Sequence, residues 1–312
     1  MLKDFEMRPI LVIVIFALHV VSGISRAEIG RYTTTRTDTN HCNQAMEDTY
    51  SCWIGKSMLS RQNEFYKMLK SKATTSNLVI LSFVDHSYVD MAVNLHESFK
   101  ALRISNFIFI CADEKAFQIL KRRGISAFLY QHSEMNSDES PEYYSEAFIL
   151  KVSIKIKILT AAIMHGFHVL FTDADVVFLR DPIPYLASFN NADLVIQNDT
   201  ISGLNSGFLL VRPTYAGVTL MVRTLDIVMT RIVFDQDALN LVIDEMMASN
   251  SIAMVVLDIK KFPCGKVYFE DEKRMFLEDR FQDDVAYIVH NNFLQTKVYI
   301  FIKYNHFTIK VD

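Results

Sequence analysis

The sequence predicts an α/β fold in which helices flank a mostly parallel sheet. From residue 77 onward, short apolar runs alternate with segments whose apolar residues recur at helical spacing. Parallel strands must be joined by crossover connections, which are usually helices, so this repeated alternation indicates a parallel sheet. The chain has 312 residues, of which 50% are hydrophobic, and this is enough for one large core or two modest domains.

Two strand-helix units come first. Residues 77–84 read as a buried strand, and residues 107–111 read as the next one. Asp113 is expected to cap the N-terminus of the second helix, and Gly124 is expected to end it before another apolar run. The apolar face of the first helix is formed by Met91, Leu95, Phe99 and Leu102.

The third unit is the longest. A helix from about residue 145 to residue 165, ended by Gly166, leads into a strand over residues 168–172. Asp173 therefore stands at the carboxyl end of a sheet strand. In open α/β sheets this edge is where ligands bind, next to a switch in strand order.

Asp173 and Asp175 interrupt an apolar run, VLFTDADVVFLRDPIPYL, over residues 169–186. Unpaired carboxylates in an apolar strand would cost on the order of several kcal/mol each, so a positive partner is expected. Alternate side chains of a strand share one face, which would let both carboxylates hold one divalent cation. The alternative is that the two aspartates only end a strand and are solvated in its loop.

Composition argues against nucleic-acid binding. The net charge is −4, the sequence pI is about 6.1, and no basic stripe is present. The first strand is followed by no G-x-G-x-x-G, and the chain contains no G-x-x-x-x-G-K-[ST], so neither a dinucleotide fingerprint nor a P-loop is present.

The N-terminus is predicted to direct the chain into the secretory pathway. Lys3 and Arg8 precede an apolar stretch, residues 9–24, that is short for a membrane span of roughly 20 residues. A cleaved signal peptide and a signal anchor, with residues 1–8 in the cytoplasm, both remain open. Residues 25–76 are expected to form a luminal stem, and residues 77–312 the catalytic domain.

The four cysteines follow this apolar stretch, so an oxidising lumen would permit disulfides. Cys42 and Cys52 are the favoured pair, whereas Cys111 lies in an apolar strand and is expected to be a core thiol; no partner is assigned to Cys264. Asn198 begins the one N-glycosylation sequon, and its use is left open.

The chain also carries a family resemblance. Four motifs occur in order: KIKILTAAIMHGFHVLFTDADVVFLRDPIPYL (Lys155–Leu186), NSGF (Asn205–Phe208), DQD (Asp235–Asp237) and HNN (His290–Asn292). Together they resemble the nucleotide-diphospho-sugar transferase family, which includes plant xylosyl- and arabinosyltransferases and an amoebal galactosyltransferase. The resemblance runs from about residue 77 to residue 300. It implies a glycosyltransferase A-type fold, with a Rossmann-like, mixed and mostly parallel sheet in a single catalytic domain.

The resemblance also implies a metal site. Asp173 and Asp175 would hold the ion, and His290, which follows an apolar run, would complete the set of ligands. An imidazole nitrogen is softer than oxygen, so it favours Mn²⁺, with Mg²⁺ as the second choice.

Roles for further residues follow from the same resemblance. Asp235, Gln236 and Asp237 would act in catalysis, although Asp235 is also a sound helix N-cap on local grounds. Lys155 matches a basic position that contacts the donor in related enzymes. Lys151 and Lys157 represent the alternative, because a run of alternating lysines usually only solvates a helix. The expected substrate-binding residues are Asp85, which stands where the family often has Asn, with Lys155, Asp173, Asn205, Ser206, Gly207 and Lys297.

The function implied is a metal-dependent, retaining transfer of a sugar from a nucleotide diphosphate, with UDP favoured, to a hydroxyl of a glycan or glycoprotein. The expected location is the Golgi lumen, either as a type II membrane protein or secreted after signal cleavage. Two alternatives remain open: a haloacid-dehalogenase-like phosphatase with Asp173 as nucleophile, and a catalytically inactive sugar-binding protein on the same scaffold.

Overall fold

The structure is a computed structural model that divides into Met1–Ser60 and a second unit, Arg61–Asp312, which is compact. The signal segment, most of the expected stem, the Cys42–Cys52 pair and Lys297 lie outside the described residues. No helix among the residues described is long and apolar enough to cross a membrane. The described residues are 61–130, 146–199, 203–231, 233–268, 286–292, 298–303 and 306–311.

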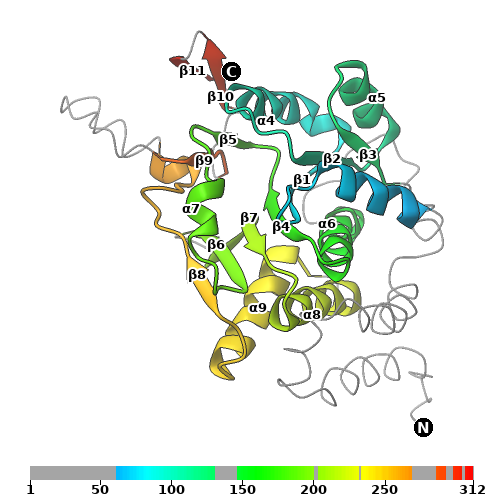
Figure 1. The fold of residues 1–312 in the computed structure, drawn as a ribbon, viewed down its shortest axis with the longest axis vertical. Coiled ribbons are helices and arrows are strands. Elements are labelled where there is room, and N and C mark those ends of the chain that lie inside the picture. The colour runs from blue at the N-terminus through cyan, green and yellow to red at the C-terminus, as the bar shows by residue number, and fades with distance from the viewer. Residues whose placement is uncertain are drawn as a thin grey trace. The chain divides into compact units, whose positions relative to one another are not determined.

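The second unit is built on a seven-stranded sheet with the order β3-β2-β1-β4-β7-β6-β8 (Figure 1). The strands are β1 (Leu78–Val84), β2 (Phe107–Cys111), β3 (Ala127–Leu129), β4 (His168–Thr172), β6 (Leu194–Asn198), β7 (Leu204–Val211) and β8 (Met254–Val256). Strands β3, β2, β1 and β4 pair in parallel, as do β6 and β8, while β7 is antiparallel to both β4 and β6. This mixed, mostly parallel sheet confirms the predicted fold class.

Helices cover both faces of the sheet (Figure 1). On one side lie α4 and α5, which contact β1, β2 and β3, and on the other lie α6, α8 and α9, which pack against one another. Asp113 caps α5 as predicted, its side chain accepting from the Ala116 N–H. The helices are η1 (His86–Tyr88), α4 (Val89–Ala101), α5 (Glu114–Arg122), α6 (Glu146–Met164), α7 (Ile183–Ala187), α8 (Tyr215–Arg231) and α9 (Asp235–Ala248).

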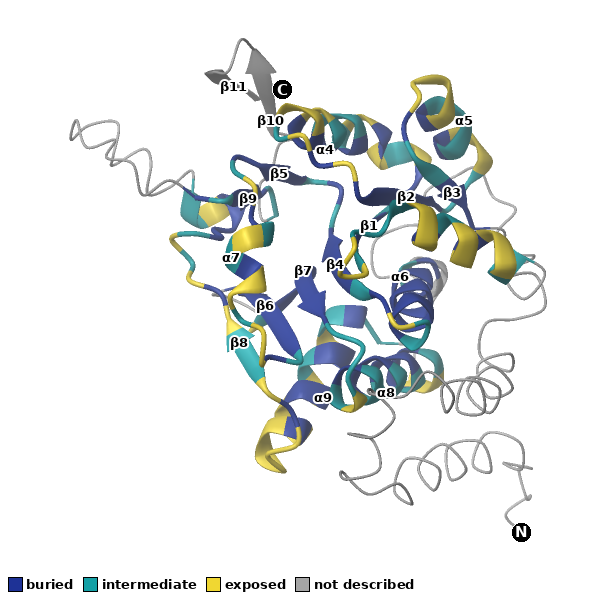
Figure 2. Ribbon diagram, in the orientation of Figure 1, coloured by how far each residue is buried: buried dark blue, intermediate teal, exposed yellow. Residues whose placement is uncertain are grey.

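The core lies between these layers, and the central strands are almost entirely buried (Figure 2). Strand β2 is buried at every position, including Cys111, which is a free thiol as expected. Residues 61–72 form a further helix within the segment expected to be stem. Its Phe65 and Leu69 are fully buried, and the Phe65 ring lies 5.0 Å from that of Phe128. This helix therefore contributes to the core of the second unit.

A smaller sheet brings a late segment of the chain beside the segment that follows β4. Strand β5 (Val176–Phe178) pairs antiparallel with β9 (Ile288–His290), and Val176 stands opposite His290. Strands β10 (Val298–Lys303) and β11 (His306–Val311) form a separate antiparallel pair. Because β5 follows β4 after three residues, the β5–β9 pair places His290 beside the carboxyl end of β4.

The strand order also places a switch point at this position. Strand β1 has β2 on one side and β4 on the other, and the helices that lead to these two neighbours, α4 and α6, cover opposite faces. The connections thus diverge at the carboxyl ends of β1 and β4. In open α/β sheets such a divergence leaves a crevice in which ligands bind.

Candidate functional site

The two aspartates lie in a turn and not on a strand. Strand β4 ends at Thr172, residues 174 and 175 form a turn, and the Val176 N–H donates to the Asp173 carbonyl at 3.3 Å. The prediction that strand alternation aligns Asp173 with Asp175 is therefore wrong in its geometry. The chain turns here because it leaves β4 to pair with β9, and this turn brings both carboxylates to one point.

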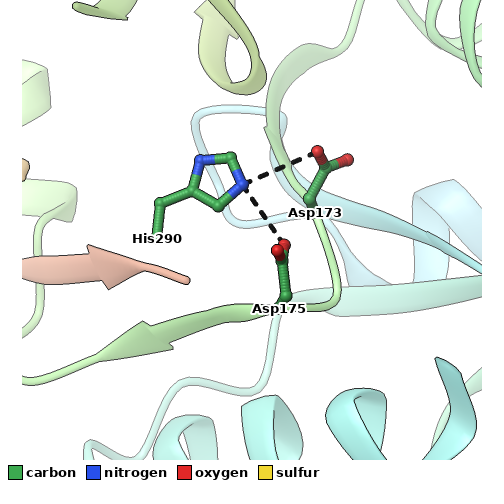
Figure 3. Close-up of side chains that lie close together, drawn as sticks. All are labelled: Asp173, Asp175 and His290. Carbon is green, nitrogen blue, oxygen red and sulfur yellow. Dashed lines mark ion pairs between the residues drawn. The ribbon is translucent and has the colours of Figure 1, made fainter. Parts of the chain in front are cut away.

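His290 completes a three-residue cluster with these carboxylates (Figure 3). Its Nε2 lies 3.2 Å from Oδ1 of Asp175 and 3.8 Å from Oδ2 of Asp173. One ligand atom from each residue falls within 4.8 Å of the other two. The Asp173 side chain is 37% exposed and that of His290 only 3%, so the cluster is open on the aspartate side.

A buried amide fixes the tautomer of His290. The Nε2 group of Gln197 donates to the carbonyls of Phe262 and Pro263, at 3.0 and 3.2 Å, so its Oε1 must face the histidine. His290 Nδ1 lies 2.9 Å from that oxygen and therefore carries the proton. When the ring is neutral, as metal binding requires, its lone pair is on Nε2 and faces the two carboxylates, which is how metal-binding histidines are commonly held.

Gly207 supplies the space for the cluster. Its N–H donates to Asn205 Oδ1 at 2.6 Å, and its carbonyl accepts from the Asp173 N–H at 2.7 Å. A Cβ atom at this position would stand 2.2 Å from Oδ2 of Asp173 and 2.5 Å from Cε1 of His290. Only glycine leaves room for the carboxylate and the imidazole together.

The electrostatics of the cluster favour positive charge between the carboxylates. Burial opposes protonation of His290, but the charges of Asp175 and Asp173 and the hydrogen bond to Asp175 raise its pKa. Burial opposes ionisation of Asp175, but His290 lowers the pKa of that carboxyl. The pKa of Asp173 is raised, by burial and by the charges of Asp175 and Asp235. Two carboxylates and an imidazole nitrogen fit a divalent cation such as Mn²⁺.

Lys155 connects the cluster with α9. Its Nζ lies 2.8 Å from Oδ2 of Asp235 and 3.5 Å from Oδ1 of Asp173, and it donates to Ser206 Oγ at 3.1 Å. Ser206 Oγ in turn donates to Asp235 at 2.8 Å. Burial opposes the charge on Lys155, but the two aspartates raise its pKa, so the ammonium is retained. The ammonium also lies 4.6 Å from the centre of the Phe171 ring.

Two local predictions around this lysine are wrong. Lys151, Lys155 and Lys157 are all buried, so the alternating lysines of α6 do not solvate the helix. The reason is that α6 lies between the sheet and α8, which leaves it little exposed surface. Asp235 is not the N-cap of α9 either, because Phe234 holds that position. Asp235 is instead the first helical residue, and its carboxylate pairs with Lys155.

The other expected residues are placed as follows. Asp85 follows β1, accepts from the Ser87 N–H at 2.8 Å and forms a buried ion pair with Lys151. The Gln236 Oε1 accepts from the Ser206 N–H at 3.1 Å, which joins α9 to the start of β7. Asp237, in the first turn of α9, is exposed.

Asp199 and Gln197 are residues of this site that the sequence did not reveal. Asp199 is 1% exposed and accepts hydrogen bonds from the side-chain amides of Asn205, Gln236 and Asn292. It directly follows β6, which runs parallel to β4, just as Asp173 directly follows β4. This shared position is the signal that could have found it. In the sequence Asp199 stood inside the glycosylation sequon, whose Asn198 ends β6 and is half-buried.

Together, the sheet and the acidic turn at its carboxyl edge define the class: an α/β protein of the A-type glycosyltransferase fold. The family model for nucleotide-diphospho-sugar transferase matches residues 102–299, and the chain belongs to that family. The predicted family is thereby confirmed. The phosphatase and the inactive sugar-binding alternatives are not favoured by this match.

Several characterised proteins are similar to parts of the chain. Beta-arabinofuranosyltransferase RAY1 of Arabidopsis thaliana is 27% identical over 169 residues, which cover 50% of this chain and 32% of the relative. UDP-galactose:fucoside alpha-3-galactosyltransferase of Dictyostelium discoideum is 24% identical over 287 residues, covering 75% of this chain and 43% of the relative. The chain therefore matches less than half the length of either relative.

Among solved structures, the glycosyltransferase GlyE of Streptococcus pneumoniae TIGR4 is 15% identical with a TM-score of 0.45. The superposition covers 72% of this chain and 56% of that one.

Proposed function

We propose that this protein is a metal-dependent, retaining glycosyltransferase that moves a sugar from a UDP-sugar to a hydroxyl of a glycan or glycoprotein. The observation that carries the proposal is the convergence of Asp173, Asp175 and Nε2 of His290 at the carboxyl edge of the sheet. Family membership supports a nucleotide-sugar donor. The name of the Dictyostelium relative, which specifies UDP-galactose, supports UDP as the nucleotide.

The cation proposed for the three ligands is Mn²⁺, with Mg²⁺ as the second choice, because an imidazole nitrogen accompanies the two carboxylates. When bound, the ion supplies positive charge against the diphosphate that leaves as the sugar is transferred. The protein supplies the fixed geometry: Gln197 holds His290 in the ligating tautomer, and Gly207 keeps the space open.

Residues at the start of α9 are proposed to act on the sugar. Lys155 fixes Asp173 and Asp235 relative to each other, which sets the distance between the metal ligands and this helix. Gln236 is held against β7, and the exposed Asp237 is accessible to a donor or acceptor sugar. Attack from the face of the departing phosphate would give retention without a strong protein nucleophile. Asn205, Ser206 and Asp85 are proposed to line the donor site together with Gln236 and Asp237.

The proposed location is the Golgi lumen, with the N-terminal apolar segment as anchor or cleaved signal. Lys297 is proposed to contact the diphosphate as a point charge.

A panel of nucleotide sugars tests the function directly. The full-length protein is incubated with each member in the presence of Mn²⁺ or of EDTA, and release of the nucleotide diphosphate is measured. We expect hydrolysis of at least one UDP-sugar with Mn²⁺ and none with EDTA. Loss of a residue that only hydrogen-bonds to a metal ligand typically costs about 10–100-fold in activity. Asp175→Ala removes a ligand itself, so its rate should fall by more than about 100-fold.

Asp244→Ala is the matched control, because Asp244 is an exposed aspartate of α9 outside the cluster. Its rate should equal that of the wild type. Hydrolysis that is insensitive to EDTA, or full activity of Asp175→Ala, would contradict metal dependence. Hydrolysis of simple phosphate esters but of no nucleotide sugar would contradict the glycosyltransferase assignment.

A further inference from the structure

Asp199 is a buried carboxylate that collects hydrogen bonds from three separate segments. Its Oδ1 accepts from Nδ2 of Asn205, at the start of β7, and from Nδ2 of Asn292, after β9, both at 3.0 Å. Its Oδ2 accepts from Nε2 of Gln236, in the first turn of α9, also at 3.0 Å. None of these four residues is a ligand in the Asp173 cluster.

A carboxylate can only accept hydrogen bonds, so it decides which way each amide is turned. With their nitrogens facing Asp199, the amide oxygens point to backbone N–H groups. Asn205 Oδ1 accepts from Gly207 at 2.6 Å, Gln236 Oε1 accepts from Ser206 at 3.1 Å, and Asn292 Oδ1 accepts from Gly265 at 3.3 Å. A reversed amide would set N–H against N–H at each of these places.

The segments of Gly207 and Asn292 adjoin the Asp173–Asp175–His290 cluster. Gly207 packs directly against the side chains of Asp173 and His290, and Asn292 follows His290 by two residues. Gln236 precedes the exposed Asp237. The orientation of three amides around the cluster thus depends on one buried charge.

We infer that Asp199 is a positioning residue, which holds the amide of Gln236 and the segments of Asn205 and Asn292 in the orientation that transfer requires. The inference rests on the proposed glycosyltransferase function. Asp199 acts through these amides and not by contact with the substrate.

The chain offers a matched control at the other end of the same strand. Asp193 immediately precedes β6, and it accepts from Thr214 Oγ1 at 2.7 Å and from the Ala253 N–H at 2.8 Å. Like Asp199 it joins separate segments by hydrogen bonds, but its partners are not those of the metal cluster. Asp193→Asn therefore shows how far the loss of such hydrogen bonds affects the fold without a change at the cluster.

The experiment compares Asp199→Asn with Asp193→Asn in the full-length protein. The probe is hydrolysis of UDP-galactose with saturating Mn²⁺, or of whichever nucleotide sugar in the panel the wild type turns over fastest. In Asp199→Asn the new amide nitrogen must face one of these three amide nitrogens, and at the position of Oδ2 it removes the hydrogen bond from Gln236. We expect kcat to fall about 10- to 100-fold with the KM for the donor nearly unchanged, because small misplacements have effects of this size. Asp193→Asn should keep the wild-type kcat.

A charge-swapped pair tests the hydrogen bond itself. In Asp199→Asn/Gln236→Glu, the new amide can donate to the new carboxylate, which can still accept from the Ser206 N–H. We expect each single variant to lower the thermal midpoint and the double variant to recover part of the loss. Additive losses, or a kcat of Asp199→Asn within twofold of the wild type, would overturn the inference. If the wild type hydrolyses no nucleotide sugar, the proposed function fails, while the thermal comparison still decides whether Asp199 orients Gln236.

Discussion

Gly207 is the residue with the least freedom to change at the site. It stands between the Asp173 carboxylate and the His290 ring, and it also bonds through its N–H to Asn205. A single carbon added here meets the carboxylate oxygen well inside van der Waals contact, at 2.2 Å. Movement of either neighbour would disturb a further contact, because the Asp173 carboxylate pairs with Lys155 at 3.5 Å and the His290 ring is bonded to Gln197 at 2.9 Å.

Gly207→Ala is therefore expected to abolish Mn²⁺-dependent activity and to weaken Mn²⁺ binding at least about 10-fold, the low end of the loss when the support of a metal ligand is removed. Binding is measured by titration calorimetry with MnCl₂. The control is Gly124→Ala, where a Cβ meets nothing within 4 Å but the φ of +72° is strained. That variant should lose about 1 kcal/mol of stability and bind Mn²⁺ normally. Normal binding by Gly207→Ala would mean that the cluster is not the metal site.

At this scale, the sequence could predict residues that interrupt an apolar pattern but not residues that act through others. Asp173 and Asp175 were predictable because two charges in an apolar run require a partner. Gln197 and Asp199 were not, because a glutamine in a strand and an aspartate after it are common without any role. Asp235 was misassigned as a cap, because its partner Lys155 lies 80 residues earlier in the chain, and the helix-start pattern explained it locally.

Four helices end in the same way, with a left-handed residue followed by a residue whose N–H reaches back five positions. In α4, Arg103 N–H bonds to Lys100 and Ile104 N–H bonds to Phe99, which is the Schellman pattern. The next residue in three of the four is a buried apolar one that draws the chain into the core. The left-handed residues are Arg103, Gly124, Gly166 and Asn250, after α4, α5, α6 and α9.

The two helix ends that carry glycine, at Gly124 and Gly166, were predicted from the sequence. The helix end at Arg103 was not, because nothing in the sequence marks it. A glycine at a helix end has a clear physical reason, because it adopts φ > 0 without a Cβ clash. An arginine at the same place is read as an ordinary helical residue. Here the burial of Ile104 and the bonds of the motif outweigh the strain at Arg103, whose φ is +58°.

Arg103→Gly is accordingly expected to stabilise the protein by about 0.5–1 kcal/mol, since relief of the left-handed strain exceeds the added entropy of the unfolded chain. For a domain of this size the thermal midpoint should rise by about 1–4 °C. Arg103→Ala is the control, because it removes the same side chain but keeps the Cβ. No gain is expected from it. An equal gain in both variants would assign the effect to the arginine side chain and not to the backbone.

At the scale of the whole molecule, the alternation of strands and helices predicted the parallel half of the sheet, because each crossover helix leaves its own periodic pattern. The reversal of β7 and the pairing of β5 with β9 had no such signal. Short strands of three residues carry too little pattern to assign a partner, and β9 lies more than a hundred residues after β5. Only the expected role of His290 as a ligand indicated that β9 lies near Asp173 and Asp175.

The proposed metal site should therefore act as a cross-link between distant parts of the fold. Asp173 and Asp175 come from the β4–β5 turn, while His290 comes from the end of β9, so a bound ion ties the C-terminal segment to the central sheet. An ion that binds only the folded state at 100 times its Kd stabilises that state by about 2.7 kcal/mol. We expect Mn²⁺ at this excess to raise the thermal midpoint by about 5–10 °C and EDTA to reverse the shift.

Variant Asp175→Ala should show no Mn²⁺-dependent shift, whereas the exposed-site control Asp244→Ala should show the full one. Mg²⁺ should give a smaller shift than Mn²⁺ at equal concentration, because one of the three ligands is an imidazole nitrogen. An equal shift in wild type and Asp175→Ala would place the bound ion elsewhere in the protein. Ca²⁺ serves as the final comparison, since its preference for six to eight oxygen ligands makes a site of two carboxylates and one imidazole a poor one, and its shift should be the smallest of the three.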